Sequence, residues 1–254
     1  VCRCGCRPPG GIRQIGGGGE FPCVGCGHRV NRGLMTERDQ SAGRFITFEG
    51  GEGSGKSTTT AALVTSLSAS GLSVLATREP GGAPGAEHIR SLLVSGAVDR
   101  WDPMAEALLH FAARREHLEH TIRPALEDGT WVVCDRFYDS TMAYQGYGQG
   151  LGPVAVRNLQ FVALGDFAPD LTIVLDIPPQ DGLGREINSD ASDETRYGRM
   201  GAEFHARVRD GFLAIAAAEP DRCVVIDAAQ SLDDVQDAIW QTVSDRLGVT
   251  SHGG

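Results

Sequence analysis

The chain has 254 residues, a formal net charge of −10 at pH 7, and charged side chains at 22% of its positions. This acidic balance argues against a general nucleic-acid-binding surface, which needs clustered positive charge. No apolar run approaches the length of a membrane-spanning helix and no signal peptide is visible, so we expect a soluble, cytoplasmic protein with no membrane partner.

Residues 1–43 differ in composition from the rest. They hold five of the seven cysteines, among many glycines and without apolar periodicity: Cys2, Cys4, Cys6, Cys23 and Cys26. Cys23 to His28 resembles half of a zinc knuckle, but the apolar residues that usually surround a zinc fold are missing. We therefore expect a disordered extension, or sequence upstream of a true start at Met35, rather than a metal site. The folded domain should span 44–248, with a flexible tail at 249–254.

Short apolar runs predict five buried strands, at 44–49, 73–77, 131–134, 171–175 and 222–226. Helices are predicted between and after them, at 57–69, at 87–94, from Pro103 to about Leu118 with Asp102 as N-cap, and at 153–164, 203–218 and 232–247. Buried strands that alternate with helices indicate an α/β protein with a five-stranded parallel sheet flanked by helices on both faces. Ligands of such folds bind at the carboxyl ends of the strands.

The first strand leads into a phosphate-binding loop. Residues 50–57 read G-G-E-G-S-G-K-S and match the pattern G-x-x-x-x-G-K-[ST] in full. Lys56 is the only lysine in the chain, which indicates that a compact ammonium is needed where a planar guanidinium would not serve. The backbone N–H groups should surround the phosphates of a nucleoside triphosphate, ATP or GTP, with Lys56 on the β- and γ-phosphates and Ser57 on Mg²⁺. The residues predicted to bind this nucleotide are Gly50, Gly51, Glu52, Gly53, Ser54, Gly55, Lys56, Ser57 and Thr58.

Several classes of protein carry this loop, and other sequence features, above all the end of the third strand, indicate which class this chain fits. A GTPase needs an N-K-x-D element, which a chain whose only lysine is Lys56 does not contain. Energy-coupling ATPases usually end a strand in paired acids, whereas this strand ends in Asp135 and Arg136. An acid followed by a phosphate-binding arginine suits a kinase that holds Mg²⁺ and a phosphorylated acceptor together, with Asp135 orienting the metal through water.

From Arg44 to Leu247 the chain resembles the thymidylate kinase family. The matching segments are F-E-G-G-E-G-S-G-K-S-T at 48–58, T-R-E-P-G-G at 77–82, I-R-S-L-L at 89–93, F-A-A-R at 111–114, D-R-F at 135–137, S-T-M-A-Y-Q-G at 140–146 and P-D-L at 169–171. The resemblance implies a P-loop NTPase fold with a mobile lid, and a homodimer that uses Mg²⁺ and transfers the ATP γ-phosphoryl group to dTMP in dTTP biosynthesis. The alternatives are another nucleoside monophosphate kinase, or a nucleotide-binding module without turnover.

The resemblance also implies roles for single residues. Glu52 would accept a hydrogen bond from the sugar 3′-hydroxyl, Arg90 and Arg136 would clamp the acceptor phosphate, Ser140 and Thr141 would face the thymine edge, and Tyr144 would lie beside C2′. In the family, the residue that stacks on thymine usually precedes the base-reading arginine by four positions. That spacing leaves two pairs open here, His110 with Arg114 or Phe111 with Arg115. For Phe111 and Tyr144, ordinary core packing is the alternative.

A polar, unpatterned segment bracketed by arginines lies at about 184–199. In family members with a small residue at the position of Gly53, the arginine that stabilises the transferring phosphoryl group comes from a lid. The resemblance therefore implies that Arg185 and Arg196 are catalytic, together with Lys56 and Arg136. A plain surface loop is the alternative.

Overall fold

The computed structural model describes residues 42–187 and 196–250. Nearly all of the predicted N-terminal extension, the middle of the predicted lid and residues 251–254 therefore lie outside the described residues. The described residues belong to one compact unit. Among them, no helix has the length and apolar character that a membrane crossing requires.

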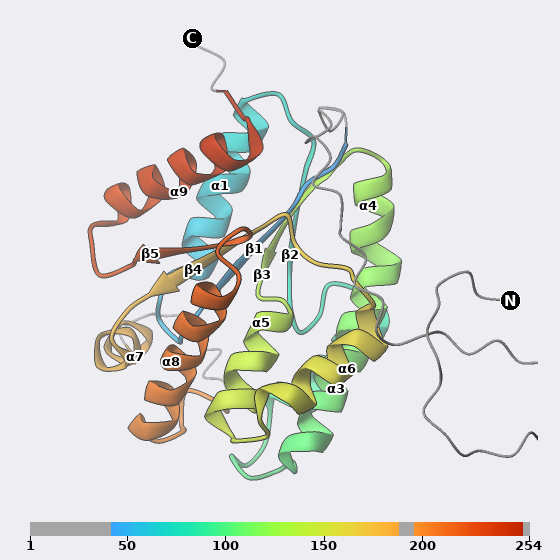
Figure 1. The fold of residues 1–254 in the computed structure, drawn as a ribbon, viewed down its shortest axis with the longest axis vertical. Coiled ribbons are helices and arrows are strands. Elements are labelled where there is room, and N and C mark those ends of the chain that lie inside the picture. Colours follow the sequence, from blue (N-terminus) through green and yellow to red (C-terminus); the bar gives the residue numbers. More distant parts are fainter. Residues whose placement is uncertain (1–41, 188–195, 251–254) are drawn as a thin grey trace, which may run out of the picture. The chain divides into compact units, whose positions relative to one another are not determined.

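A parallel sheet of five strands lies at the centre of the fold (Figure 1). The strands are β1 (Phe45–Gly50), β2 (Val74–Arg78), β3 (Trp131–Asp135), β4 (Leu171–Asp176) and β5 (Cys223–Asp227). Their order across the sheet is β2-β3-β1-β4-β5, and every neighbouring pair is parallel. The sheet is as predicted, with strand ends that differ by at most one residue. The order brings the carboxyl ends of β1 and β3 together, with Phe48 opposite Asp135.

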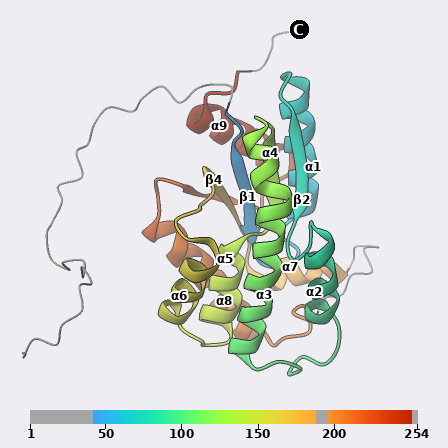
Figure 2. The same ribbon diagram turned by 90° about the vertical axis from the view of Figure 1, so that its right-hand side faces the viewer.

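Alternate residues of the central strands serve two separate cores, because successive side chains of a strand point to opposite faces. Ile46 and Val133 pack under α1 (Lys56–Ala69) and α9 (Leu232–Leu247). Phe45 and Val132 pack on the other face, where α3 (Pro103–His117), α6 (Pro153–Leu164) and α8 (Ala202–Ala218) lie (Figures 1 and 2). Val249, which we assigned to the C-terminal tail, is buried in the first of these cores.

The predicted helices form, and several begin earlier or continue further. Helix α2 (Pro84–Val94) begins three residues before its predicted start and packs against α3. Asp102 caps α3 as predicted, since its Oδ1 accepts hydrogen bonds from the backbone N–H groups of Met104 and Ala105. Helix α3 runs on through a π-helical turn, η1 (Leu118–Ile122), into α4 (Arg123–Glu127).

Two helical segments were not predicted. One is α5 (Tyr138–Thr141), which continues as the π-helical η2 (Met142–Gly148), and the other is α7 (Pro179–Ile187). Nearly every residue of α5 and η2 is buried, so the segment lacks the alternation of apolar and polar faces by which a helix is recognised in a sequence. Helix α7 contains two glycines, and its last residues fall in the segment that we predicted as a lid loop.

Candidate active site

A pocket of about 560 Å³ opens at the carboxyl ends of β1, β2 and β3. It collects residues from the phosphate loop, α2, α3, the end of β3, α5, η2 and α7. Among the residues predicted for the site, those that line it are Glu52, Gly53, Gly55, Lys56, Ser57, Thr58, Arg90, His110, Asp135, Arg136, Ser140, Thr141, Tyr144 and Arg185. Side chains predicted from motifs scattered over 134 positions of the chain therefore share one cavity.

The phosphate loop joins the end of β1 to the first turn of α1. Gly53 and Gly55 have φ values of 65° and 88°, which glycine adopts without the steric cost that a side chain would add. Gly53 also lies against Gly182 of α7, so that a Cβ at position 53 would collide with the Gly182 carbonyl. These conformations leave N–H groups at the positive end of α1, an arrangement that favours an anion.

The Lys56 side chain folds back over this loop and is buried. Its Nζ donates hydrogen bonds to the Gly51 carbonyl at 2.7 Å, and to the Gly50 carbonyl and Ser54 Oγ at 3.2 Å each. Gly50, Gly51 and Ser54 thus hold the ammonium of Lys56. Burial and, to a smaller extent, the positive charge of Arg136 lower the pKa of Lys56 to about 8.

Ser57 and Asp135 lie side by side at the mouth of the loop. Ser57 Oγ donates a hydrogen bond to Asp135 Oδ2 at 2.8 Å. A hydroxyl and a carboxylate oxygen are hard ligands, and both line the pocket beside the loop that would hold the phosphates. The residues present therefore fit a Mg²⁺ ion.

Arg136 and Tyr144 form a connected polar group with Glu52 of the phosphate loop. Arg136 Nη2 donates to Glu52 Oε2 and to Tyr144 Oη, both at 3.2 Å, and the Tyr144 hydroxyl donates to Glu52 Oε1 at 2.9 Å. Burial alone would raise the pKa of Glu52, but the charges of Arg136 and Lys56 outweigh it and hold this pKa below its usual range. Glu52 is therefore a carboxylate at neutral pH, able to accept a further hydrogen bond.

Arg136 has a left-handed backbone, with φ of 74°. A residue with a side chain adopts this conformation at a cost of about 1–3 kcal/mol, and such residues cluster at functional sites. Here the conformation aims the guanidinium back across β1, where Nη1 donates to the Gly50 carbonyl and to Ser140 Oγ at 3.1 Å each. Arg90, on α2, reaches the same cavity and donates from Nη1 to the Pro80 carbonyl at 2.8 Å.

The structure places the two candidate base-reading pairs differently. Arg114 is buried, with Nε on Glu79 Oε2 at 2.6 Å and Nη1 on Thr141 Oγ1 at 3.0 Å. Phe111 packs in the core beneath it, 5.1 Å from ring centroid to the Arg114 Cζ. Arg115 points to α6, where it donates to the Ala163 carbonyl. His110 lines the pocket, and Arg114, which does not, donates to Thr141, which does.

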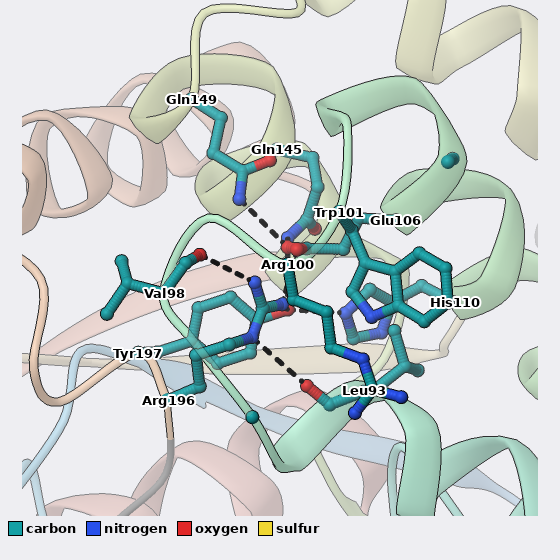
Figure 3. A network of polar contacts seen from close by, with 12 residues as sticks. Leu93, Val98, Arg100, Trp101, Glu106, His110, Gln145, Gln149, Arg196 and Tyr197 are labelled. Atoms are coloured by element: carbon teal, nitrogen blue, oxygen red, sulfur yellow. Dashed lines mark hydrogen bonds and ion pairs between the residues drawn. The ribbon is translucent and has the colours of Figure 1, made fainter.

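The two predicted lid arginines also lie in different surroundings. Arg185, on α7, lines the pocket while its Nη1 donates to the Ala228 carbonyl at 2.9 Å. Arg196 is fully buried, forms an ion pair with Glu106, and donates to the carbonyls of Leu93 and Val98 (Figure 3). It does not line the pocket as described.

Several residues that hold the predicted site residues in place were not predicted from the sequence. Glu79 anchors Arg114, and Tyr197 joins His110 to Glu106. Glu79 lay inside the T-R-E-P-G-G segment, and Glu106 lies one helical turn before His110, but neither pattern indicates a hydrogen-bond partner that is distant in the sequence. Burial, followed by the charges of Arg114, Arg196 and Arg136, lowers the pKa of His110 to about 3, so the imidazole is neutral.

Comparison with known proteins agrees with this geometry. The profile of the thymidylate kinase family matches residues 48–239. The thymidylate kinase of Caulobacter vibrioides is 52% identical over 208 residues, which cover 82% of this chain and 99% of that protein. That of Rhizorhabdus wittichii is 49% identical over 205 residues, covering 81% and 99%. The crystal structure of thymidylate kinase from Ehrlichia chaffeensis aligns with a TM-score of 0.64 and 36% identity, over 80% of this chain and 99% of that one. The chain belongs to the thymidylate kinase family.

Proposed function

We propose that this chain transfers the γ-phosphoryl group of ATP to dTMP, forming dTDP and ADP for the synthesis of dTTP. The observation that carries the proposal is a single cavity lined both by a phosphate loop and by two further arginines, Arg136 and Arg90, whose guanidinium groups can bind a second anion. Two anion sites at a shared opening are what a kinase with a phosphorylated acceptor requires. Membership of the thymidylate kinase family supports dTMP as that acceptor.

On the donor side, the loop N–H groups and Lys56 would bind the ATP phosphates. Ser57 and Asp135 would hold Mg²⁺, which when bound neutralises charge on the phosphates. Arg185 lines the pocket and is therefore the predicted lid arginine best placed to meet charge on the transferring group.

On the acceptor side, Arg136 and Arg90 would clamp the dTMP phosphate, because forked guanidinium donors match phosphate oxygens. Glu52 would accept a hydrogen bond from the sugar hydroxyl, and the Tyr144 ring would fill the space beside C2′. His110, Arg114, Ser140 and Thr141 would surround the base. The acceptor phosphate is already ionised, so catalysis needs positioning and charge stabilisation rather than a general base.

A coupled assay of ADP release over a panel of nucleoside monophosphates tests this function. We expect dTMP to give the highest kcat/KM, and chelation of Mg²⁺ to abolish turnover. A preference for UMP or CMP would instead indicate a different monophosphate kinase. ATP binding without ADP release for any acceptor would indicate a nucleotide-binding module.

Nucleotide binding should take up a proton at alkaline pH. In the free protein the pKa of Lys56 is about 8. Bound phosphates favour the ammonium and raise this pKa, so binding of an ATP analogue should take up more protons at about pH 9 than at about pH 7.5. Calorimetry in two buffers of different ionisation enthalpy measures the uptake. Uptake that is equal at both pH values, or that survives Lys56→Met, would assign the proton to another group.

We further propose that the protein forms a homodimer through α3 and α6. Helix α6 exposes Val154, Phe161 and Val162 at 71%, 66% and 84%, and α3, which packs against α6, exposes Leu108 at 51%. Large apolar side chains gathered on neighbouring helices are typical of a subunit interface. A second copy of the chain would cover them.

Phe161→Asp should convert a dimer into a monomer, because the interface would have to bury a charge without a partner. Light scattering coupled to size-exclusion chromatography measures the mass. Leu232→Asp is the matched control, since Leu232 is exposed at 49% on α9, which packs on the opposite face of the sheet. A dimer that persists in Phe161→Asp would place the interface elsewhere.

A further inference from the structure

The left-handed backbone of Arg136 is tethered on both sides. The Arg136 N–H donates to the Phe48 carbonyl at 2.9 Å, and Cys134 Sγ donates to the Arg136 carbonyl at 3.0 Å. The next N–H along the chain, that of Phe137, donates to Glu49 Oε1 at 2.7 Å. A residue keeps a conformation that costs free energy only when surrounding contacts determine it. Arg136 therefore owes its orientation to three contacts, of which one comes from the Glu49 side chain.

Glu49 lies on β1 directly before the phosphate loop, and its side chain is fully buried. Its Oε1 also accepts from the N–H of Ser140 at 3.2 Å. Phe137 is the N-cap of α5 and has no side-chain acceptor, so Glu49 supplies from another strand the oxygen that a capping side chain would provide. The other oxygen, Oε2, lies 2.6 Å from Ser140 Oγ, which accepts from Arg136 Nη1 at 3.1 Å. Glu49 thus contacts the turn that carries Arg136 and, through Ser140, its guanidinium.

Glu49 keeps these hydrogen bonds whether or not it carries a proton. Burial, followed by the negative charge of Asp139, raises the pKa of Glu49 to about 8 against the opposing charge of Arg136, so the carboxyl group is mostly neutral at pH 7. Oε1 accepts from both N–H groups in either form. Oε2 accepts from Ser140 Oγ as a carboxylate and donates to it as a carboxylic acid. The contribution of Glu49 is therefore one of geometry rather than of charge.

We propose that Glu49 is a positioning residue for phosphoryl transfer, which caps the turn 136–140 and thereby keeps the Arg136 guanidinium directed into the pocket, toward the acceptor phosphate. This inference rests on the proposed function. Displacement of a positioned group by about 1 Å can lower a rate by about 10²-fold. Because the turn 136–140 lies on the acceptor side, loss of Glu49 should impair the use of dTMP and leave the affinity for ATP nearly unchanged.

Three variants separate this role from a contribution to stability alone. Glu49→Met removes both oxygens, whereas Glu49→Gln keeps an acceptor at Oε1 and places a donor toward Ser140, as the neutral carboxyl group does. Thr47→Val is the matched control, because Thr47 is buried on the same face of β1 and its hydroxyl bonds to Thr172 rather than to the turn. In the ligand-free protein, NMR should show faster hydrogen exchange of the Phe137 and Ser140 amides, relative to the sheet amides, in Glu49→Met only.

The kinetic arm measures ADP release with dTMP and ATP varied in turn. Glu49→Met should raise the KM for dTMP and lower kcat by about tenfold each, with the KM for ATP within about threefold of the wild-type value. Glu49→Gln should keep most of the activity, and Thr47→Val all of it. In an Arg136→Met background, Glu49→Met should cause little further loss, because it acts through Arg136.

Unchanged dTMP kinetics or unchanged amide exchange in Glu49→Met would overturn the proposal. So would a Glu49→Gln protein as impaired as Glu49→Met, or losses that add to those of Arg136→Met. If Glu49→Met does not fold, Glu49→Asp takes its place, because it withdraws the carboxyl group from the turn by one methylene and should show the same pattern to a smaller extent. A wild-type protein that does not phosphorylate dTMP would refute the proposed function and leave the amide-exchange result standing.

Discussion

Replacement of Lys56 by methionine is expected to lower turnover of dTMP by about 10²–10³-fold or more, which is the usual effect of removing a donor that stabilises transition-state charge. The free protein should remain folded. Burial and the charge of Arg136 disfavour the ammonium and lower its pKa to about 8, so the charged side chain costs stability at neutral pH and this cost falls as pH rises from about 8. Methionine keeps the length of the side chain and removes the charge.

Lys56→Arg, measured in the same experiment, keeps the positive charge and changes the shape of the charged group. The buried Nζ contacts the Gly50 and Gly51 carbonyls and Ser54, a space fitted to a compact ammonium rather than to a planar fork. We expect Lys56→Arg to be nearly as inactive as Lys56→Met. The readouts are kcat from ADP release and the midpoint of thermal unfolding. Turnover within about threefold of the wild-type value in either variant would contradict the role of Lys56.

Arg196→Met is expected to lower the free energy of unfolding by about 3–5 kcal/mol, because it leaves Glu106 as a buried, uncompensated charge. Both side chains are fully buried in the structure. Urea denaturation at neutral pH measures the loss. The matched control is the double variant with Glu106→Met, which removes both charges and should recover most of the stability.

The same variants address the catalytic role that the sequence assigned to Arg196. Measured well below the unfolding midpoint, Arg196→Met should retain more of the wild-type kcat than Arg185→Met, because Arg185 lines the pocket and Arg196 does not. An Arg196→Met protein of unchanged stability with severely reduced kcat would contradict the structural role and favour a lid that brings Arg196 to the transferring group.

Some local patterns proved sufficient to predict the fold. The strands and most helices follow from apolar periodicity, and the N-cap of α3 follows from Asp102 and Pro103. Positions of the phosphate loop adopt backbone conformations that favour glycine, so its sequence motif identifies the loop. The buried segment 138–148 shows where such reasoning fails, because a helix that is covered on all sides has no polar face to reveal its period.

By itself, the sequence determined the sheet, the family resemblance and the residues of the phosphate loop, since each of these depends on neighbours within a few positions of the chain. Only the tertiary structure shows that His110 lines the pocket while Phe111 packs in the core, because this depends on which side of α3 meets the pocket. Only the tertiary structure shows that Arg196 pairs with Glu106, which lies 90 positions away in the sequence. A polar side chain takes its role from the partner that satisfies its charge when buried, and partners so distant in sequence are brought together only by the packing of the whole fold.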